Sequence, residues 1–303
     1  MDISNTKTNY ILGVKVDFGH TVADVLMLLE SKLNSDAPNL ICTTNPEFIM
    51  QALHDSEFRS IINSSTLSLP DGYGVILAYE YLVKCRELKR DSLFFLRAFL
   101  AGLEIGLTPI YTKNQIQERM SGSDLIYDIC KLSEQKGYSI YLLGGQVKDQ
   151  WGRMTKDIDL ATYTAETLRK QFPKLNIIGA TSKFSYRPEE DILTQQHIFE
   201  QLKNSGQNKI DFLFVAYGHG NQEKWIARNA SKINAKVCLG VGGSFEFITG
   251  AKKRAPLILR RYGLEYIYRL LQEPWRLKRV VTAFPIFPVS MYFYVLRHKS
   301  IDM

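Results

Sequence analysis

The chain has 303 residues, of which 45% are hydrophobic and 23% are charged. This balance excludes a disordered tail protein, a collagen-like fibre and a polytopic membrane protein, and the length allows one large α/β domain or two smaller ones. Of the 38 Lys and Arg residues, 11 lie in 251–303 beside only three Asp or Glu, so this tail accounts for the whole net charge of +7. A basic tail on a nearly neutral body predicts an anionic partner, which is a membrane face, a phosphate-rich substrate or a nucleic acid.

Short apolar runs alternate with longer amphipathic stretches along the chain. The predicted strands are 11–18, 40–43, 139–143, 175–178, 211–216 and 236–241. The predicted helices are 21–33, 46–63, 124–136, 166–171, 191–204 and 221–229. Strands that are separated by crossover helices predict an α/β fold with mostly parallel sheets, covered by helices on both faces.

Several predicted strands end in polar or glycine-rich segments, which are 43–47, 144–145, 217–222 and 240–246. Ligands bind open parallel sheets beyond the carboxyl ends of the strands, and glycine lets backbone N–H groups approach a phosphate. Any one of these segments alone is explained by a tight turn, but four together predict a ligand-binding rim. The chain has neither a Walker nor a Rossmann fingerprint.

Two apolar stretches have about the length of a membrane span. The first, 92–111, contains Arg97 and Glu104, which would be costly in hydrocarbon, so we expect an amphipathic or core helix that ends before Pro109. The second, 280–296, contains two prolines, which argue against an uninterrupted spanning helix. Its aromatic residues and Arg-rich flanks suit a membrane interface, and a segment packed on the body is the equal alternative.

The four cysteines are dispersed and lack a C-x-x-C spacing, so buried free thiols are predicted instead of disulfides or a zinc site. They are Cys42, Cys85, Cys130 and Cys238. The histidines are scattered and no cluster of metal-ligating residues is recognised, so no metal site is predicted. The N-terminal residues lack a signal pattern, and a cytoplasmic, reduced protein is expected.

Asp71 is the most suggestive acid in the chain. It lies in a Pro-Asp-Gly sequence that is also typical of turns. A carboxylate on such a turn at a ligand-binding rim can serve as a general base for a hydroxyl group. No second acid suited to glycoside hydrolysis accompanies it. His219, in a glycine loop, is a candidate acid, base or ligand, although such a histidine is more often structural.

Three arginines near the C-terminus form a second candidate cluster. Arg269, Arg276 and Arg279 share a broad face if one helix continues through them, whereas Pro274 alternatively ends one helix and begins another. Guanidinium groups bind phosphate through paired hydrogen bonds, so the cluster suits a diphosphate. A solvated or lipid-facing basic strip is the alternative.

The order of motifs resembles the WecG/TagA/CpsF glycosyltransferase family. The matching segments are TTNPE at 43–47, LPDGYG at 69–74, ERMSGSDL at 118–125, YLLGG at 141–145, GHGNQEKWIAR at 218–228, GVGGSFEF at 240–247 with KRAP at 253–256, and RYGLEYIYR at 261–269 with Glu273-Pro. Members of the family transfer a sugar, often N-acetylmannosamine or its uronic acid, from a UDP donor. The acceptor is typically a polyprenyl-diphosphate-linked sugar at the cytoplasmic membrane face, in the synthesis of surface polysaccharides or teichoic-acid linkage units.

The resemblance implies a compact, inverting glycosyltransferase fold that needs neither a metal nor another cofactor. Asp71 would be the base that acts on the acceptor hydroxyl. The donor pocket would be lined by Thr43, Asn45, Arg119 and Gln222. A membrane-contacting, helical C-terminal appendage would deliver Arg269, Arg276 and Arg279 to the diphosphate.

The implied organisation is a catalytic domain at 1–250 and a basic, aromatic appendage at 251–303. The interval between Asp71 and Arg119 exceeds the family's usual spacing, which implies an insertion at about 84–114. A peripheral protein on the inner face of the cell membrane is expected, and a homo-oligomer is carried over from relatives. The alternative function is a noncatalytic protein whose tail binds anionic lipid or nucleic acid, although no nucleic-acid module is present, so no nucleic-acid partner is expected.

Overall fold

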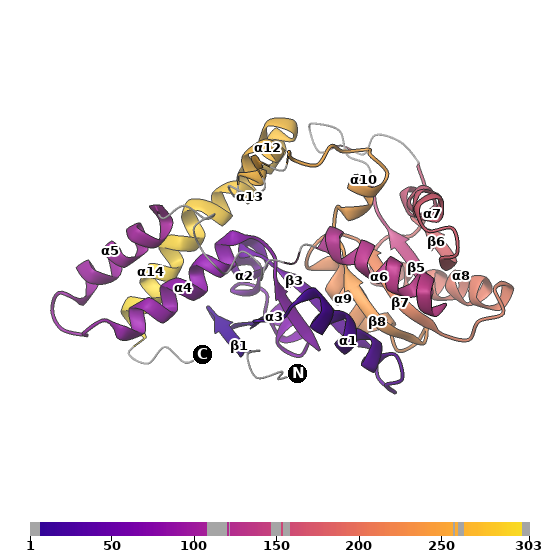
Figure 1. Cartoon of the computed structure of the whole chain (residues 1–303), viewed down its shortest axis with the longest axis horizontal. Coiled ribbons are helices and arrows are strands. Elements are labelled where there is room, and N and C mark those ends of the chain that lie inside the picture. The colour runs from indigo at the N-terminus through magenta and orange to yellow at the C-terminus, as the bar shows by residue number, and fades with distance from the viewer. Residues whose placement is uncertain are drawn as a thin grey trace.

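The computed structural model describes residues 7–107, 120, 122–146, 153, 158–256, 258–259 and 264–298 of the chain. Its centre is a six-stranded parallel sheet in the order β4-β3-β8-β7-β5-β6, with helices on both faces (Figure 1). The strands are β3 (Asn39–Thr44), β4 (Leu67–Pro70), β5 (Ser139–Gly144), β6 (Asn176–Thr181), β7 (Ile210–Ala216) and β8 (Ala235–Gly240). The predicted α/β class with a parallel sheet is therefore confirmed.

Most helices of the body follow the predicted pattern, with differences at some ends, whereas those at 73–87 and 244–248 were not predicted. The body helices are α1 (Val22–Lys32), α2 (Pro46–Ala52), α3 (Ser56–Asn63), α4 (Tyr73–Glu87), α5 (Phe94–Leu107), α6 (Gly122–Lys136), α7 (Leu160–Gln171), α8 (Asp191–Asn204), α9 (Asn221–Asn229) and α10 (Ser244–Ile248), with a 3-10 turn η3 (Pro188–Glu190). The predicted single helix 46–63 is wrong, because Asp55 begins a new helix by accepting a hydrogen bond from Phe58 N at 3.0 Å. Helix α7 begins earlier than the predicted 166–171, because Asp159 caps it.

The first predicted strand, 11–18, is also wrong in its extent. The chain turns inside it, so β1 (Lys7–Ile11) and β2 (Val14–Phe18) form an antiparallel hairpin. The turn residues Leu12 and Gly13 have φ of 52° and 78°. A two-residue turn with positive φ at both positions matches the twist of paired strands, which explains why the pairing closes here.

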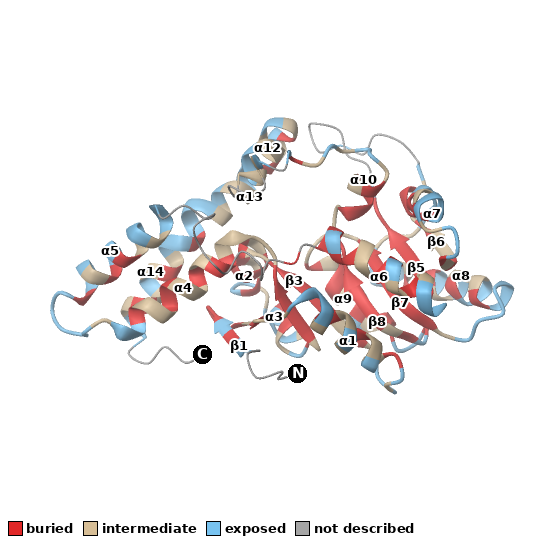
Figure 2. Ribbon diagram, viewed as in Figure 1, coloured by how far each residue is buried: buried red, intermediate tan, exposed pale blue. Residues whose placement is uncertain are grey.

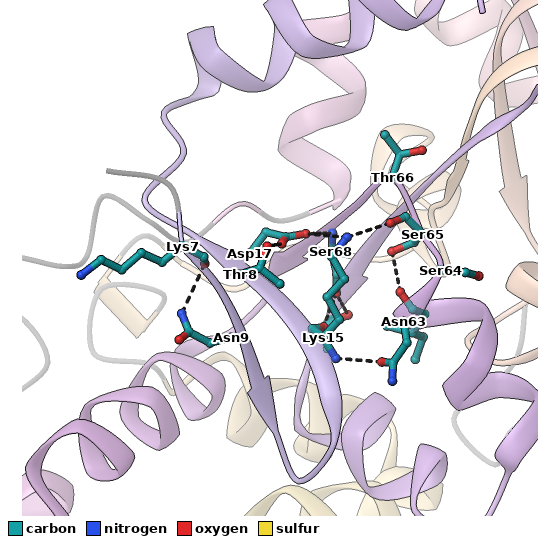
Figure 3. Close-up of polar contacts among 12 residues, drawn as sticks. Lys7, Thr8, Asn9, Lys15, Asp17, Asn63, Ser64, Ser65, Thr66 and Ser68 are labelled. Carbon is teal, nitrogen blue, oxygen red and sulfur yellow. Dashed lines mark hydrogen bonds and ion pairs between the residues drawn. The ribbon is translucent and has the colours of Figure 1, made fainter. Parts of the chain in front are cut away.

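Figure 3 shows the polar contacts that hold this hairpin beside β4. Asp17 accepts hydrogen bonds from Thr8 Oγ1 at 2.5 Å and from Ser68 N at 2.8 Å. Lys15 Nζ donates to Ser65 O at 2.8 Å and lies 3.4 Å from Asp17 Oδ2. These groups satisfy one another, so the cluster has a structural role. The strand that it supports, β4, was not predicted, because its four residues include Ser and Pro.

Alternating side chains divide the core between the two faces of the sheet. On one face, Ile140, Phe212 and Val237 pack with α1, α6, α7 and α10. On the other face, Leu213 and Cys238 pack with α8 and α9. The middle strands β5 and β7 are buried along their whole length, as continuous apolar runs in parallel sheets predict. All four cysteines are buried free thiols, which confirms that prediction.

The described C-terminal residues 264–298, here called the appendage, form a series of short helices. They are α12 (Glu265–Gln272), a 3-10 turn η4 (Pro274–Arg276), α13 (Leu277–Val281), a π turn η5 (Thr282–Ile286) and α14 (Phe287–Arg297). Pro274 therefore begins a new helical segment, as one of the two alternatives predicted. The expected division of the chain near residue 250 stays a prediction.

By length and composition, Pro274–Arg297 is the one stretch among the described residues that is apolar and long enough to cross a membrane. The extended backbone of Phe284, with φ of −159° and ψ of 121°, interrupts it, as expected from its prolines. Phe287, Met291 and Val295 of α14 are buried in the cluster that includes α2, α4 and α5. One side of α14 therefore packs on the protein.

The other apolar stretch, 92–111, forms α5 up to Leu107, and its last residues lie outside the described part of the chain. Phe94, Ala98 and Ala101 of α5 are buried in the same cluster as α14. The expected amphipathic helix is therefore present. Helices α4, α5 and α14, here called the helical lobe, lie together at one end of the molecule (Figure 1).

Candidate functional site

The carboxyl ends of four neighbouring strands, β4, β3, β8 and β7, bring the motif segments to one edge of the sheet. Asp71 follows β4, Asn45 follows β3, and the glycine-rich segments 240–246 and 217–222 follow β8 and β7. Backbone hydrogen bonds join neighbouring ends, because Asp71 N donates to Thr44 O at 2.8 Å and Val241 N donates to Val215 O at 2.9 Å. Segments 43–47, 217–222 and 240–246 of the predicted rim therefore lie at one edge, and ligand binding there stays a prediction.

Asp71 lies on the turn between β4 and α4. Pro70 pairs with Thr44, so Asp71 lies directly beside the end of β3. Gly72 caps α4 with φ of 93°, a backbone conformation that favours glycine. The backbone of the half-buried Asp71 is therefore held by a short turn, which suits a residue whose carboxylate must meet a hydroxyl in one geometry.

The segments 43–47 and 69–74 contact each other at this edge. A Cβ atom on Gly74 would lie 2.7 Å from Pro46 Cγ, so the start of α4 touches the start of α2. Thr43 is buried, and a Cβ atom on Gly122 would lie 3.5 Å from its Oγ1, so the first turn of α6 covers Thr43. The Asn45 side chain caps α2, because Oδ1 accepts a hydrogen bond from Phe48 N at 3.1 Å.

Gln222 is buried at the start of α9 and bonds within the protein at both ends of its amide. Its Nε2 donates to Glu223 Oε1 at 2.7 Å, and its Oε1 accepts from Gly242 N at 3.0 Å. A Cβ atom on Gly240 would lie 2.3 Å from Gln222 Nε2 and 2.4 Å from Glu223 Oε1. In this arrangement, Gln222 joins the segment after β7 to the segment after β8.

Glu223 is fully buried beside Gln222. Its Oε2 accepts a hydrogen bond from Gly220 N at 2.7 Å. Burial raises the pKa of Glu223 to about 7, because the charged carboxylate is poorly solvated there. Glu223 therefore titrates near neutral pH, although its hydrogen bonds to Gln222 and Gly220 favour the charged form.

Two appendage arginines, Arg269 and Arg276, lie around a buried carboxylate, Glu273. Arg276 Nε and Lys252 Nζ each lie 2.5 Å from Glu273, and Lys252 also lies 2.7 Å from Glu246, in the segment after β8. Arg269 Nη2 lies 4.0 Å from the same Glu273 carboxylate. Burial, together with Arg269 and Arg279, lowers the pKa of Arg276 to about 10. These contacts link the appendage to the strand ends.

Arg279 makes a second link, directly to α2. Its Nε donates to Glu47 Oε2 at 2.5 Å, and its Nη2 lies 3.3 Å from His219 Nδ1. Burial and the Arg279 charge lower the pKa of His219 to about 4, so this ring is neutral and Nδ1 accepts the hydrogen bond. The structural interpretation of His219, as a partner of Arg279, is favoured.

The structure thus brings Asp71, Thr43, Asn45 and Gln222 to one edge and links the three appendage arginines to that edge. Arg119 lies outside the described residues. Four charged residues that sequence reasoning missed hold this arrangement together. They are Glu47, Glu223, Lys252 and Glu273. Three of them, Glu47, Glu223 and Glu273, are acids inside the quoted motifs, and that position was the available signal.

The arginines are suited to bind an anion. A guanidinium group carries five N–H donors, and Glu273 and Glu47 engage the Nε atoms of Arg276 and Arg279. Arg279 Nη2 also contacts His219, whereas within the described part of the chain the Nη1 groups of Arg276 and Arg279 make no hydrogen bond and are available to phosphate oxygens. Among the described residues, no group of three or more His, Cys, Asp or Glu side chains is placed to hold a metal ion.

A model of the glycosyl transferase WecG/TagA/CpsF family matches residues 9–104 and 101–301. The matched residues include the strand-end segments and the appendage described above.

Several similar proteins carry the name N-acetylglucosaminyldiphosphoundecaprenol N-acetyl-beta-D-mannosaminyltransferase. The protein from Bacillus subtilis (strain 168) is 26% identical over 243 residues, which are 80% of this chain and 75% of that protein. The protein from Staphylococcus aureus (strain MRSA252) is 28% identical over 294 residues, which are 95% of this chain and 92% of that protein. The protein from Staphylococcus aureus (strain MW2) is 27% identical over the same length.

Proposed function

The chain belongs to the WecG/TagA/CpsF family and is a glycosyltransferase, and we propose that it moves an N-acetylmannosamine-type sugar from UDP to a polyprenyl-diphosphate-linked N-acetylglucosamine. The names of the similar transferases support this acceptor and this sugar. The UDP donor is the part of the proposal that rests on the family resemblance alone. Because the chain is an enzyme, the alternative of a noncatalytic binding protein is set aside.

In the proposed reaction, the acceptor hydroxyl oxygen attacks the anomeric carbon of the donor sugar. The bond from that carbon to UDP breaks, and the hydroxyl proton passes to the carboxylate of Asp71. A base is needed because a sugar hydroxyl is a weak nucleophile while it keeps its proton. The single displacement inverts the anomeric centre. The turn that carries Asp71, beside the end of β3, supports this role.

The departing UDP gains negative charge, and preorganised cations accelerate such a step. The observation that carries the proposal is the contact between Arg279 and Glu47, because it links the basic tail to the edge that holds Asp71. We assign Arg269, Arg276 and Arg279 to a diphosphate, and Thr43, Asn45, Arg119 and Gln222 to the donor pocket. No metal or other cofactor is part of this proposal.

The proposal includes a peripheral position on the cytoplasmic face of the membrane. The similar transferases act on lipid-linked substrates by name, and the appendage combines basic ends with an apolar middle. A polyprenyl acceptor keeps its lipid tail in the bilayer, so the enzyme must work at that surface. A homo-oligomer stays a prediction.

The test is UDP release from a panel of UDP-sugars, with a short-chain polyprenyl-diphosphate-N-acetylglucosamine acceptor and EDTA present. Asp71→Asn should lower turnover by about 10²–10⁴-fold, because it removes general-base catalysis but preserves side-chain shape. Asp36→Asn, an exposed carboxylate in the loop before β3, is the control and should keep wild-type turnover. Equal turnover in Asp71→Asn and the wild type would exclude Asp71 as the base. Failure of all donors to bind or react would overturn the proposed reaction.

A further inference from the structure

We propose that α5 and α14 together form a membrane-docking face, so that the insertion binds the lipid surface together with the basic tail. This inference rests on the proposed function, in which the acceptor is lipid-linked. The apolar face consists of six exposed side chains: Phe95, Leu96, Phe99, Leu100 and Leu103 of α5, and Phe293 of α14. The partner that we assign to it is an anionic phospholipid bilayer.

The exposure of these side chains is unusual for large apolar groups that lie together. Each is between 44% and 54% exposed. On α5 they recur at intervals of three and four residues, which gathers them on one side of the helix, while Phe94, Ala98 and Ala101 are buried on the other side. Figure 2 shows the resulting exposed surface along α5, in contrast to the buried strands of the sheet.

Direct contacts join the two helices that carry the apolar face. Tyr292 Oη of α14 donates a hydrogen bond to Phe95 O of α5 at 3.2 Å. The Tyr292 ring meets the Phe99 ring edge-on at 6.1 Å and the Phe293 ring at 5.5 Å. Arg90, just before α5, donates to His298 O at 2.7 Å, beyond the end of α14. The insertion and the appendage therefore present their exposed apolar groups as one unit.

The charges around the apolar face favour lipid over another protein. Residues 277–298 contain no Asp or Glu, and apart from Arg279, which pairs with Glu47, they contain the cations Lys278 and Arg297. Arg297 follows Phe293 by one helical turn, so a cation borders the apolar side chains. The one carboxylate of α5, Glu104, pairs with Lys84 of α4 at 2.5 Å. Apolar groups bordered by cations are the pattern of helices that lie in an anionic membrane interface.

The appendage connects the apolar face to the candidate site. The appendage carries Arg276 and Arg279 to the sheet edge and then runs through η5 into α14. An acceptor whose lipid tail lies in the bilayer presents its diphosphate at the membrane surface. Docking through α5 and α14 therefore holds the arginines near the depth at which that diphosphate lies.

The experiment is flotation of the full-length protein with vesicles of phosphatidylcholine mixed with phosphatidylglycerol, compared with vesicles of phosphatidylcholine alone. Leu96→Ser/Leu100→Ser removes two aliphatic groups of the apolar face. The matched control, Ile192→Ser/Leu193→Ser, removes two from α8, where they are 67% and 55% exposed. We expect the α5 variant to lose vesicle affinity on the order of tenfold, because partial insertion of each leucine contributes to binding, and the α8 variant to bind like wild type.

Amide hydrogen exchange supplies a second measurement on the wild type, and on any variant whose thermal unfolding midpoint is unchanged. Anionic vesicles should slow exchange in 93–107 and leave 191–204 unchanged. Equal flotation of the two variants, or no protection of 93–107, would overturn the inference. A loss of self-association without a loss of flotation would instead identify the apolar face as an interface between copies. Wild-type turnover on the short-chain acceptor in solution tests the proposed function separately, since it needs no vesicle.

Discussion

The sheet body and the helical lobe use apolar residues in opposite ways. In the body, apolar side chains fill both faces of the sheet, and β5 and β7 are buried along their whole length. In the lobe, α14 buries only three of its residues, and most of the large apolar groups of α5 are exposed (Figure 2). A continuous apolar area on a protein surface marks a place where something binds. One side of the lobe therefore packs on the body, and the exposed apolar side is the one that we assign to the membrane.

The body and the appendage also differ in charge, and ion pairs join them. The body contributes the acids Glu47 and Glu246, and the appendage contributes Arg276 and Arg279, with Glu273 shared between Lys252 and Arg276. Buried pairs of this kind stabilise a fold little overall, but removing one partner is costly. Their role here is to fix where the appendage lies on the sheet edge.

The largest expected effect in this comparison is at Arg279. If the appendage completes the site of the body, Arg279→Gln should lower turnover on a soluble acceptor by about 10²–10³-fold, because it removes a preorganised cation from the departing diphosphate. Steady-state UDP release measures this. Arg59→Gln, an exposed arginine on α3, is the control. If Arg279→Gln stays within about twofold of wild type, Arg279 does not take part in the chemistry.

The next effect concerns the pH dependence of stability. Burial, together with Arg279 of the appendage, shifts the pKa of His219, whereas burial within the body shifts the pKa of Glu223. The folded pKa of His219 is lowered to about 4, so its contribution is present above pH 6.5 and is lost as the pH falls. The folded pKa of Glu223 is raised to about 7, so acidification from pH 7 stabilises the fold through this group. As the pH falls, His219 therefore destabilises the fold and Glu223 stabilises it.

Between pH 7 and pH 5, Glu223→Gln should therefore lose about 2 kcal/mol more unfolding free energy than wild type, and His219→Gln about 2 kcal/mol less. Urea unfolding at both pH values measures these differences. Parallel pH profiles for all three proteins would contradict the assignment. Arg279→Gln should reduce only the His219 contribution, since Arg279 helps to keep that ring neutral.

The smallest effect is at Glu47, which we expect to position Arg279 without touching substrate. Glu47→Gln should lower turnover on a soluble acceptor by about tenfold, and Glu47→Gln/Arg279→Gln should be no slower than Arg279→Gln alone. Glu57→Gln, which removes an exposed carboxylate paired with Lys224, is the control. Additive losses in the double variant would mean that Glu47 acts independently of Arg279.

The sheet was predictable because its strands are short apolar runs with helices between them, and the strand ends followed from parallel pairing. Asp71 was recognisable from its glycine-flanked turn and from the motif around it. The hairpin turn at Leu12 and Gly13 was hidden inside an apolar run, and β4 was not recognised because Ser68 and Pro70 interrupt its apolar pattern. The expected roles of Asp71 and of the donor-pocket residues stay predictions.

The contact between Glu47 and Arg279 was beyond sequence reasoning for a physical reason. The two residues are 232 positions apart, and only the folded path of the appendage brings them together. Sequence reasoning also could not tell which side of α5 is exposed, because the spacing of its apolar residues is that of any amphipathic helix. Which side is covered depends on α4 and α14.

The close approaches of Gly74 to Pro46, and of Gly240 to Gln222 and Glu223, have a consequence for related sequences. At each glycine, a methyl group would collide with a residue from another motif. An alignment should therefore show coupled substitution at these sites. A homologue that replaces Gly240 must move or shorten the side chain at 222 or 223, and one that replaces Gly74 must shift or change Pro46. Such coupled substitutions would reveal these two contacts from the sequences of relatives alone.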